Sequence, residues 1–314
     1  MQGSALQYST LTCSALLFET IDKTKHMIVD IVDDWRASVV GGFKTGLFLW
    51  ESCCIPSLLY NAGSWLQLSK EAEKSLDDLQ GWYLRMLLRQ GQGVPSGAIL
   101  WESAVLSMGR RVWREKLCLS LHISRLDEDT LAKKVWEEQK VYGWPGLVSE
   151  AEYIANELGV DRVEDTSSSK KVYRQEVTEA CYKYDERMLR ERMKDKKKCE
   201  KILSEGYGRK AYFDRLLPGQ VRDHFSTHVK MLPIAGNFSR DRRFLRTGWL
   251  CLCGEREEQE HIMRHCKIYD DIRDKYGNMD NDDELVQFFR ELLERRDNVR
   301  DEEEKRRKRR SEEE

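Results

Sequence analysis

Three cysteines and one histidine near the C-terminal end are the residues in this sequence best suited to chemistry. They are Cys251, Cys253, His261 and Cys266, and their spacing is C-x-C-x7-H-x4-C. Thiolates and imidazoles are preferred ligands of Zn²⁺, and four of them complete a tetrahedral shell with no position left open for a reacting water. The spacing therefore predicts a structural zinc site.

Two features of this stretch leave alternatives open. A single residue separates the first two thiols, which makes a tight chelate, and His265 beside Cys266 is a spare donor for the fourth position. The competing interpretation is an unrelated thiol pair ahead of a helix that carries His261 and Cys266. Zinc is favoured because Gly254 supplies a turn after the thiol pair and because His261 and Cys266 lie a little over one helical turn apart.

A run of arginines and aromatic residues directly precedes the thiols. Guanidinium groups contact phosphates and aromatic rings stack on bases, so this composition predicts a surface for RNA or DNA. Aromatic packing beneath a solvated basic rim explains the same residues equally well. The candidate nucleic-acid-binding residues are Arg240, Arg242, Arg243, Phe244, Arg246 and Trp249.

No set of residues predicts catalysis. His224 and His228 lie one helical turn apart, but Phe225 stands where a zinc protease needs the glutamate that activates water. Asp33 and Asp34 resemble a polymerase metal-binding pair, yet they fall within a helical apolar stripe with too little chain ahead of them to build a palm. We therefore expect no enzymatic activity.

The composition limits the partners. The 314 residues carry a net charge of -2, so nucleic acid must be bound by local basic patches. We expect no membrane partner and no signal peptide, since the chain has neither a long apolar run nor a basic stretch before an apolar block near its start. Nine cysteines, an odd number, indicate a reducing compartment.

Helices are expected throughout, because only five prolines occur and helix-forming residues are abundant. The predicted fold class is mainly α: a helical bundle, a long helix, a small zinc-knuckle module and a charged tail. The predicted domains are an N-terminal remnant with one helix (1–40), a bundle (41–164), a linker and helical segment (165–235), the CCHC zinc-knuckle module (236–280), and an amphipathic helix with a disordered charged tail (281–314).

Charge and apolar patterns refine the C-terminal part. The basic segment Lys194–Lys198 is interpreted mainly as a solvated helix end. Beyond Arg295 the chain is almost entirely charged, which predicts a tail that is either disordered or a frayed helix. Its basic hexamer Lys305–Arg310 favours the nucleus over the cytoplasm. One apolar helix face, expected to dock on the body or on a partner, comprises Leu285, Phe288, Phe289, Leu292 and Leu293.

Several segments, taken in their order along the chain, resemble the region downstream of the polymerase core in non-LTR retrotransposon endonuclease–reverse transcriptases. They cover roughly residues 20–275 and end at the knuckle. Each helical segment is weakly specific, and the order carries the resemblance. The segments are Gly42–Ser52, Pro56–Trp65, Leu79–Arg85, Leu100–Ala104, Leu232–Phe238, Cys251–Glu255, Glu260–Ile262 and Cys266–Tyr269.

The resemblance implies a thumb-like bundle and a knuckle that help to hold template, primer or element RNA. The polymerase and endonuclease carboxylates of that family are absent here. By resemblance, the chain is a C-terminal fragment of such an element, truncated, separately expressed or mispredicted as a gene. It would act beside a polymerase core supplied in trans, or persist as a degenerate remnant that is only a helical interaction module.

Overall fold

The computed structural model describes residues 17–26, 28–29, 42–65, 68–90, 93–163, 167–216, 218–229, 250–251, 253–277 and 282–313. Within these ranges the chain is mainly α-helical, as predicted, and contains one isolated antiparallel bridge, between Leu250 and Arg256. The arginine–aromatic run at 240–249 and the Asp33–Asp34 pair lie outside the described residues.

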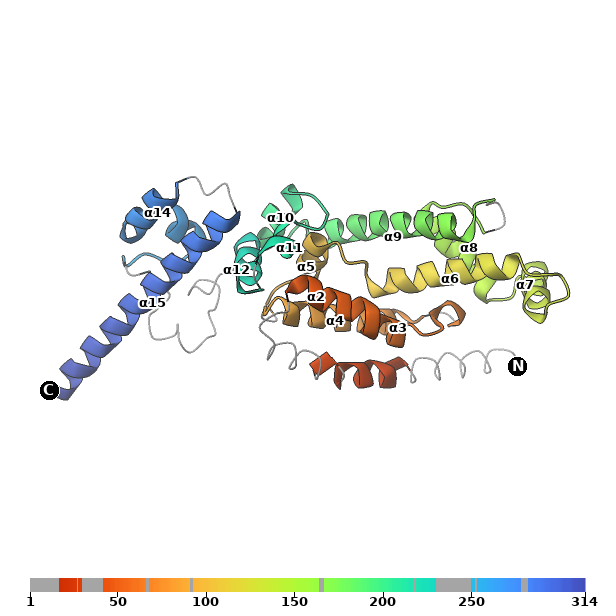
Figure 1. Cartoon of the computed structure of the whole chain (residues 1–314), viewed down its shortest axis with the longest axis horizontal. Coiled ribbons are helices and arrows are strands. Elements are labelled where there is room, and N and C mark those ends of the chain that lie inside the picture. Colours follow the sequence, from red (N-terminus) through yellow and green to blue (C-terminus); the bar gives the residue numbers. More distant parts are fainter. Residues whose placement is uncertain are drawn as a thin grey trace. The chain divides into compact units, whose positions relative to one another are not determined.

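The chain divides into two compact units, residues 1–210 and 211–314. In the first unit, residues 17–26 and 28–29 are helical. The elements that follow are α2 (Phe43–Leu49), the π-helical turn η1 (Trp50–Cys54), α3 (Ile55–Leu58), η2 (Ala62–Ser64), α4 (Lys70–Leu87), α5 (Ser96–Ser103), α6 (Met108–Ser124), α7 (Leu131–Tyr142), α8 (Leu147–Leu158), α9 (Lys170–Met193), η3 (Lys197–Cys199) and α10 (Glu200–Ser204) (Figure 1).

Side-chain caps start several of these helices. Ser69, Ser107, Thr130 and Ser169 each accept a hydrogen bond from a backbone N–H of the first turn of the helix that follows. Such caps satisfy donors that have no partner inside the helix. Helix α8 ends at Gly159, which adopts φ +67°, a left-handed conformation that glycine reaches without steric cost.

Two carboxylates from other helices hold the start of α6. Asp77 of α4 accepts the backbone N–H groups of Met108 and Gly109 at 3.0 and 3.3 Å. Asp185 of α9 accepts the backbone N–H and the hydroxyl of Ser107 at 2.8 and 2.9 Å. Burial raises the pKa of Asp77 to about 6. These bonds tie α4, α6 and α9 into one body.

The predicted boundary at residues 165–170 therefore differs from the observed division. Helix α9 packs on the bundle through Tyr173, Val177 and Cys181, which share a buried core with Leu117 and Leu121 of α6. Its buried residues recur every four positions, so the covered stripe winds gradually around the helix from Tyr173 to Met193. The first unit thus extends to Lys210.

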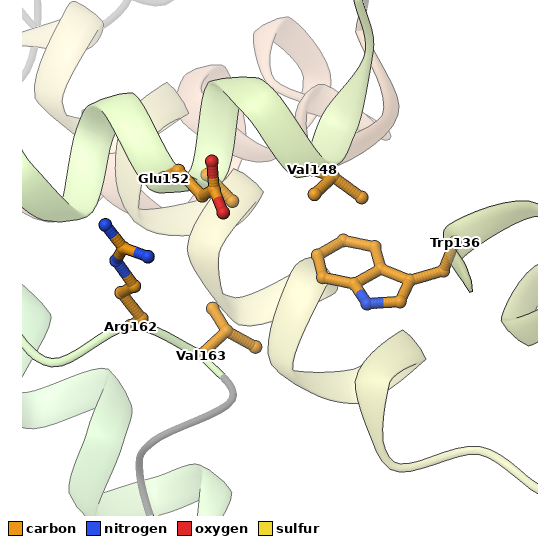
Figure 2. A pocket seen from close by; sticks show the side chains of 6 residues that line it. Trp136, Val148, Glu152, Arg162 and Val163 are labelled. Atoms are coloured by element: carbon orange, nitrogen blue, oxygen red, sulfur yellow. The ribbon is translucent and has the colours of Figure 1, made fainter. Parts of the chain in front are cut away.

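A small hollow lies where α7, α8 and the segment after α8 meet (Figure 2). Its apolar lining consists of Trp136, Val148 and Val163, which belong to the same buried core as α9. The exposed side chains of Glu152 and Arg162 border it. The hollow is thus a small gap between side chains of that buried core.

The second unit contains α11 (Tyr212–Arg215), α12 (Pro218–His228), the π-helical turn η4 (His261–His265), η5 (Lys267–Tyr269), α14 (Asp270–Tyr276) and α15 (Asp282–Glu313). The predicted apolar face of α15 packs against the residues around the cysteines, and Phe288, Phe289 and Leu292 are buried there. No described helix of either unit is long and apolar enough to span a lipid bilayer.

The charged tail was predicted to be either disordered or a frayed helix, and α15 continues as one helix to Glu313. The sequence offers a physical reason. Asp301, Glu302, Glu303 and Glu304 each precede a lysine or arginine by four positions. Such pairs, with the acid on the N-terminal side, stabilise a helix by about 0.2–0.5 kcal/mol each, and Glu, Lys and Arg are good helix formers.

Candidate metal centre

A tight turn brings the first two thiols together. The bridge between Leu250 and Arg256 closes it, and inside it the Cys251 N–H donates to the Glu255 carbonyl at 2.7 Å. The Gly254 N–H donates to the Cys251 carbonyl at 2.9 Å, with Gly254 at φ +90°. Because a side chain is strained at this φ, glycine suits the position. The turn explains how a single intervening residue suffices between the thiols.

The other two donors lie at the ends of a π-helical turn. Residues 261–265 form this turn, and the Cys266 N–H donates to the His261 carbonyl at 2.8 Å. This hydrogen bond joins residues five positions apart, one more than in an α-helix, so the turn is wider. Single π turns of this kind are frequent at functional sites. The wide turn returns the chain at Cys266 to the side on which His261 lies.

The four donor atoms converge. Cys251 Sγ and Cys266 Sγ are 3.5 Å apart, Cys253 Sγ and His261 Nε2 are 3.2 Å apart, and all four atoms lie within 4.8 Å of one another. Zn–S bonds of about 2.3 Å in a tetrahedron require sulfurs about 3.8 Å apart. The group can therefore hold a metal ion after small adjustments. His265 is exposed and is not one of the four, so the fourth donor is Cys266.

A carboxylate orients the histidine. Glu255 Oε2 lies 2.9 Å from His261 Nδ1, on the ring nitrogen that faces away from Cys253. With Nδ1 donating its proton to Glu255, Nε2 keeps its lone pair for a metal. Metal-binding histidines almost always have such a second partner, which fixes the ring orientation and raises the basicity of the nitrogen ligand.

Burial sets the protonation of the thiols. It raises the pKa of Cys251 to about 12, and it also raises the pKa of Cys266. Both thiols are therefore protonated at neutral pH when no cation is bound. Because a metal binds the thiolate, it must displace these protons, so its affinity rises with pH.

The surrounding core holds this centre in place. Cys251 and Cys266 are buried together with Ile262, Tyr269 and Ile272, against the apolar face of α15. Arg273 of α14 donates to the carbonyl of Ile262 at 2.9 Å and also to the carbonyl of Cys266. The Cys266 carbonyl also accepts the backbone N–H of Tyr269 at 3.2 Å, so these bonds hold the end of the π turn against α14.

A buried ion pair lies in the same unit. Glu257 is fully buried and follows the thiol turn by a few residues, and the side chain of Arg296 in α15 is 4% exposed. Their charged atoms are 3.9 Å apart. The opposite charges offset part of the cost of burying each group. The pair therefore joins the thiol segment to the long helix.

The structure brings together all four metal ligands predicted from the sequence, Cys251, Cys253, His261 and Cys266. Sequence reasoning missed Glu255, although its place directly after the turn glycine was a usable signal. It also missed Arg273 and the Glu257–Arg296 pair. No local signal reveals these, because their partners lie in other elements.

No family model, curated protein or solved structure matches this chain. The fold and the site together define a mainly α protein with a group of three cysteines and one histidine that can hold a metal ion.

Proposed function

We propose that this protein is a non-catalytic nucleic-acid-binding accessory fragment whose C-terminal unit is built around a structural Zn²⁺. The convergence of Cys251, Cys253, His261 and Cys266 is the observation that carries the proposal. Four protein donors would leave no position for a substrate or a reacting water, which supports a structural role. Thiolates and an imidazole in a tetrahedral arrangement favour zinc over hard cations such as Mg²⁺ and Ca²⁺.

Metal analysis of the purified protein tests the zinc centre. We expect close to one zinc per chain, and its loss in Cys253→Ser and His261→Ala. His265→Ala is the matched control, because it removes a neighbouring imidazole that is exposed and outside the donor group. Metal-free wild-type protein, or equal loss in the control, would contradict the proposal.

The arginine–aromatic run at 240–249 supports the nucleic-acid part, because it directly precedes the thiols in the sequence. Phosphate contacts release counterions, so affinity for an oligonucleotide should fall steeply as salt rises.

A double variant tests the run. Arg242→Ala with Arg246→Ala should weaken binding and flatten the salt dependence, since each phosphate contact on a single strand contributes a slope of about 0.7. The matched control is Arg256→Ala with Arg264→Ala, which removes the same charge from exposed positions beyond the run. Unchanged binding in the first variant would exclude the run as the contact surface.

We propose further that the fragment acts beside a polymerase core supplied in trans, as its resemblance to reverse transcriptases of non-LTR retrotransposons implies, with the nucleus as its site of action. It would contribute nucleic-acid contacts and no catalysis. Template-directed primer extension by the purified protein alone would refute this part.

A second candidate function is a helical protein-interaction module. It is favoured by five large apolar side chains that are exposed on α7 and the segment after it, namely Leu131, Val135, Val141, Tyr142 and Trp144. A partner held by apolar contacts would bind with little dependence on salt. The salt titration therefore distinguishes the two functions.

A further inference from the structure

Helix α9 carries a row of cations on its exposed side. Lys183, Arg187, Arg190 and Lys194 follow one another at intervals of four, three and four residues, and all are exposed. On a helix with 3.6 residues per turn this spacing places them on one face, about 16 Å long. The opposite face of α9 is buried in the first unit, so the row is presented to the solvent. We call these four residues the α9 cationic row.

The charges of the α9 cationic row are available to a ligand at low cost. Arg190 pairs with Glu186 at 3.1 Å, and Lys194 contacts Glu191. Both pairs are between exposed side chains on one helix, and such pairs contribute about 0.3–0.5 kcal/mol each. A polyanion with several phosphates can therefore displace them. Exposed Lys196 and Lys197 extend the positive charge beyond the helix.

Aromatic rings lie beside the row. Arg187 stacks over the ring of Tyr184 at 4.9 Å, and Trp113 of α6 contacts the rings of both Tyr184 and Tyr153 edge to face. Tyr153 of α8 is 58% exposed. Tyr184 is half-buried, and Arg110 also lies 4.7 Å from its ring centroid. The exposed ring of Tyr153 therefore offers the stacking face to an unpaired base, which an acidic protein segment lacks.

We propose that the α9 cationic row and the exposed ring of Tyr153 form a second nucleic-acid contact surface, which holds a single-stranded segment. The row neutralises the phosphate backbone, and the Tyr153 ring stacks on one of its bases. This inference rests on the proposed function and deepens it, since it assigns a contact to the first unit, separate from the arginine–aromatic run of the second.

The test measures binding of the full-length, metal-loaded protein to a labelled 20-nucleotide single strand of mixed sequence over a range of salt. The triple variant Lys183→Gln, Arg187→Gln and Lys194→Gln removes three cations of the row. Each phosphate contact on a single strand contributes a slope of about 0.7, so the slope of log affinity against log salt should fall by about 2. Tyr153→Ala should weaken binding roughly tenfold and leave the slope unchanged.

The matched control removes three other exposed lysines of the first unit, by Lys134→Gln, Lys170→Gln and Lys171→Gln. The inference would be overturned if the control variant lost as much oligonucleotide affinity as the row variant, or if the row variant lost none. It would also be overturned if the row substitutions weakened binding to anionic vesicles more than binding to the oligonucleotide. RNA and DNA strands of one sequence are compared in parallel.

The two levels of proposal fail in different ways. If wild-type protein binds no oligonucleotide at any salt, the proposed function itself is wrong. If binding is present and depends on Arg242 and Arg246 but not on the α9 cationic row, only the second contact surface is wrong.

Discussion

Replacing Glu255 by alanine should weaken metal binding about tenfold without removing any ligand. Glu255 lies 2.9 Å from His261 Nδ1 and holds the ring so that Nε2 faces Cys253 Sγ. Loss of such a partner typically costs 10–100-fold in metal affinity. The side chain of Glu255 is 73% exposed, and water screens and partly replaces its hydrogen bond. The effect should therefore fall near the lower limit, about 1.4 kcal/mol.

The assay is competition for Zn²⁺ against a chromophoric chelator, followed by Co²⁺ substitution in the same variants. Because the four donors remain, the Co²⁺ absorption bands should keep their position while the affinity falls. Glu255→Gln retains an acceptor and loses the charge, so it should lie between alanine and wild type. Glu258→Ala is the control, since that carboxylate is also exposed but contacts Arg256.

Two results would refute this reasoning. Equal affinities for wild type and Glu255→Ala would mean that the carboxylate does not orient the histidine. A shifted Co²⁺ spectrum would mean that Glu255 is itself a ligand and that the set of four donors is wrong.

Three further predictions concern stability, each measured by urea unfolding. Burial raises the pKa of Asp77 to about 6 in the folded state. The folded protein is therefore stabilised by the protonated carboxyl at low pH, and this part of the free energy of unfolding is lost as pH rises through 6. Asp77→Asn should therefore add up to about 3 kcal/mol at pH 7 and flatten the pH dependence between about 4 and 6. Tyr83→Phe removes a buried 2.6 Å hydrogen bond to the Gly46 carbonyl and should cost about 1 kcal/mol, because a helical N–H still bonds that carbonyl. Arg296→Met should cost about 3 kcal/mol by removing the cation that lies 3.9 Å from the buried Glu257 carboxylate, and Glu257→Gln in the same chain should restore part of that loss. The first prediction is contradicted if the stability difference between Asp77→Asn and wild type does not change with pH. The second is contradicted if Tyr83→Phe is as stable as wild type, and the third if Glu257→Gln restores no stability to Arg296→Met.

Local features of the fold were predictable because they depend on neighbouring residues. The apolar face of α15 is one such feature, since its spacing matches the helical repeat and Phe288 and Phe289 are buried as expected. For the charged tail, the sequence left both disorder and a frayed helix open. A composition rich in charge predicts disorder, whereas the order of acids and bases along the helix favours pairing.

The sequence by itself determined the mainly helical fold class and the four candidate metal ligands, because both follow from spacing over a few residues. Tertiary structure decided the rest. The choice of Cys266 over His265 depends on the π turn, and the role of Glu255 depends on how the turn faces the His261 ring. The place of α9 in the first unit depends on Asp185 reaching Ser107, 78 positions away. Contacts across such separations arise from how helices pack, and no local pattern encodes them.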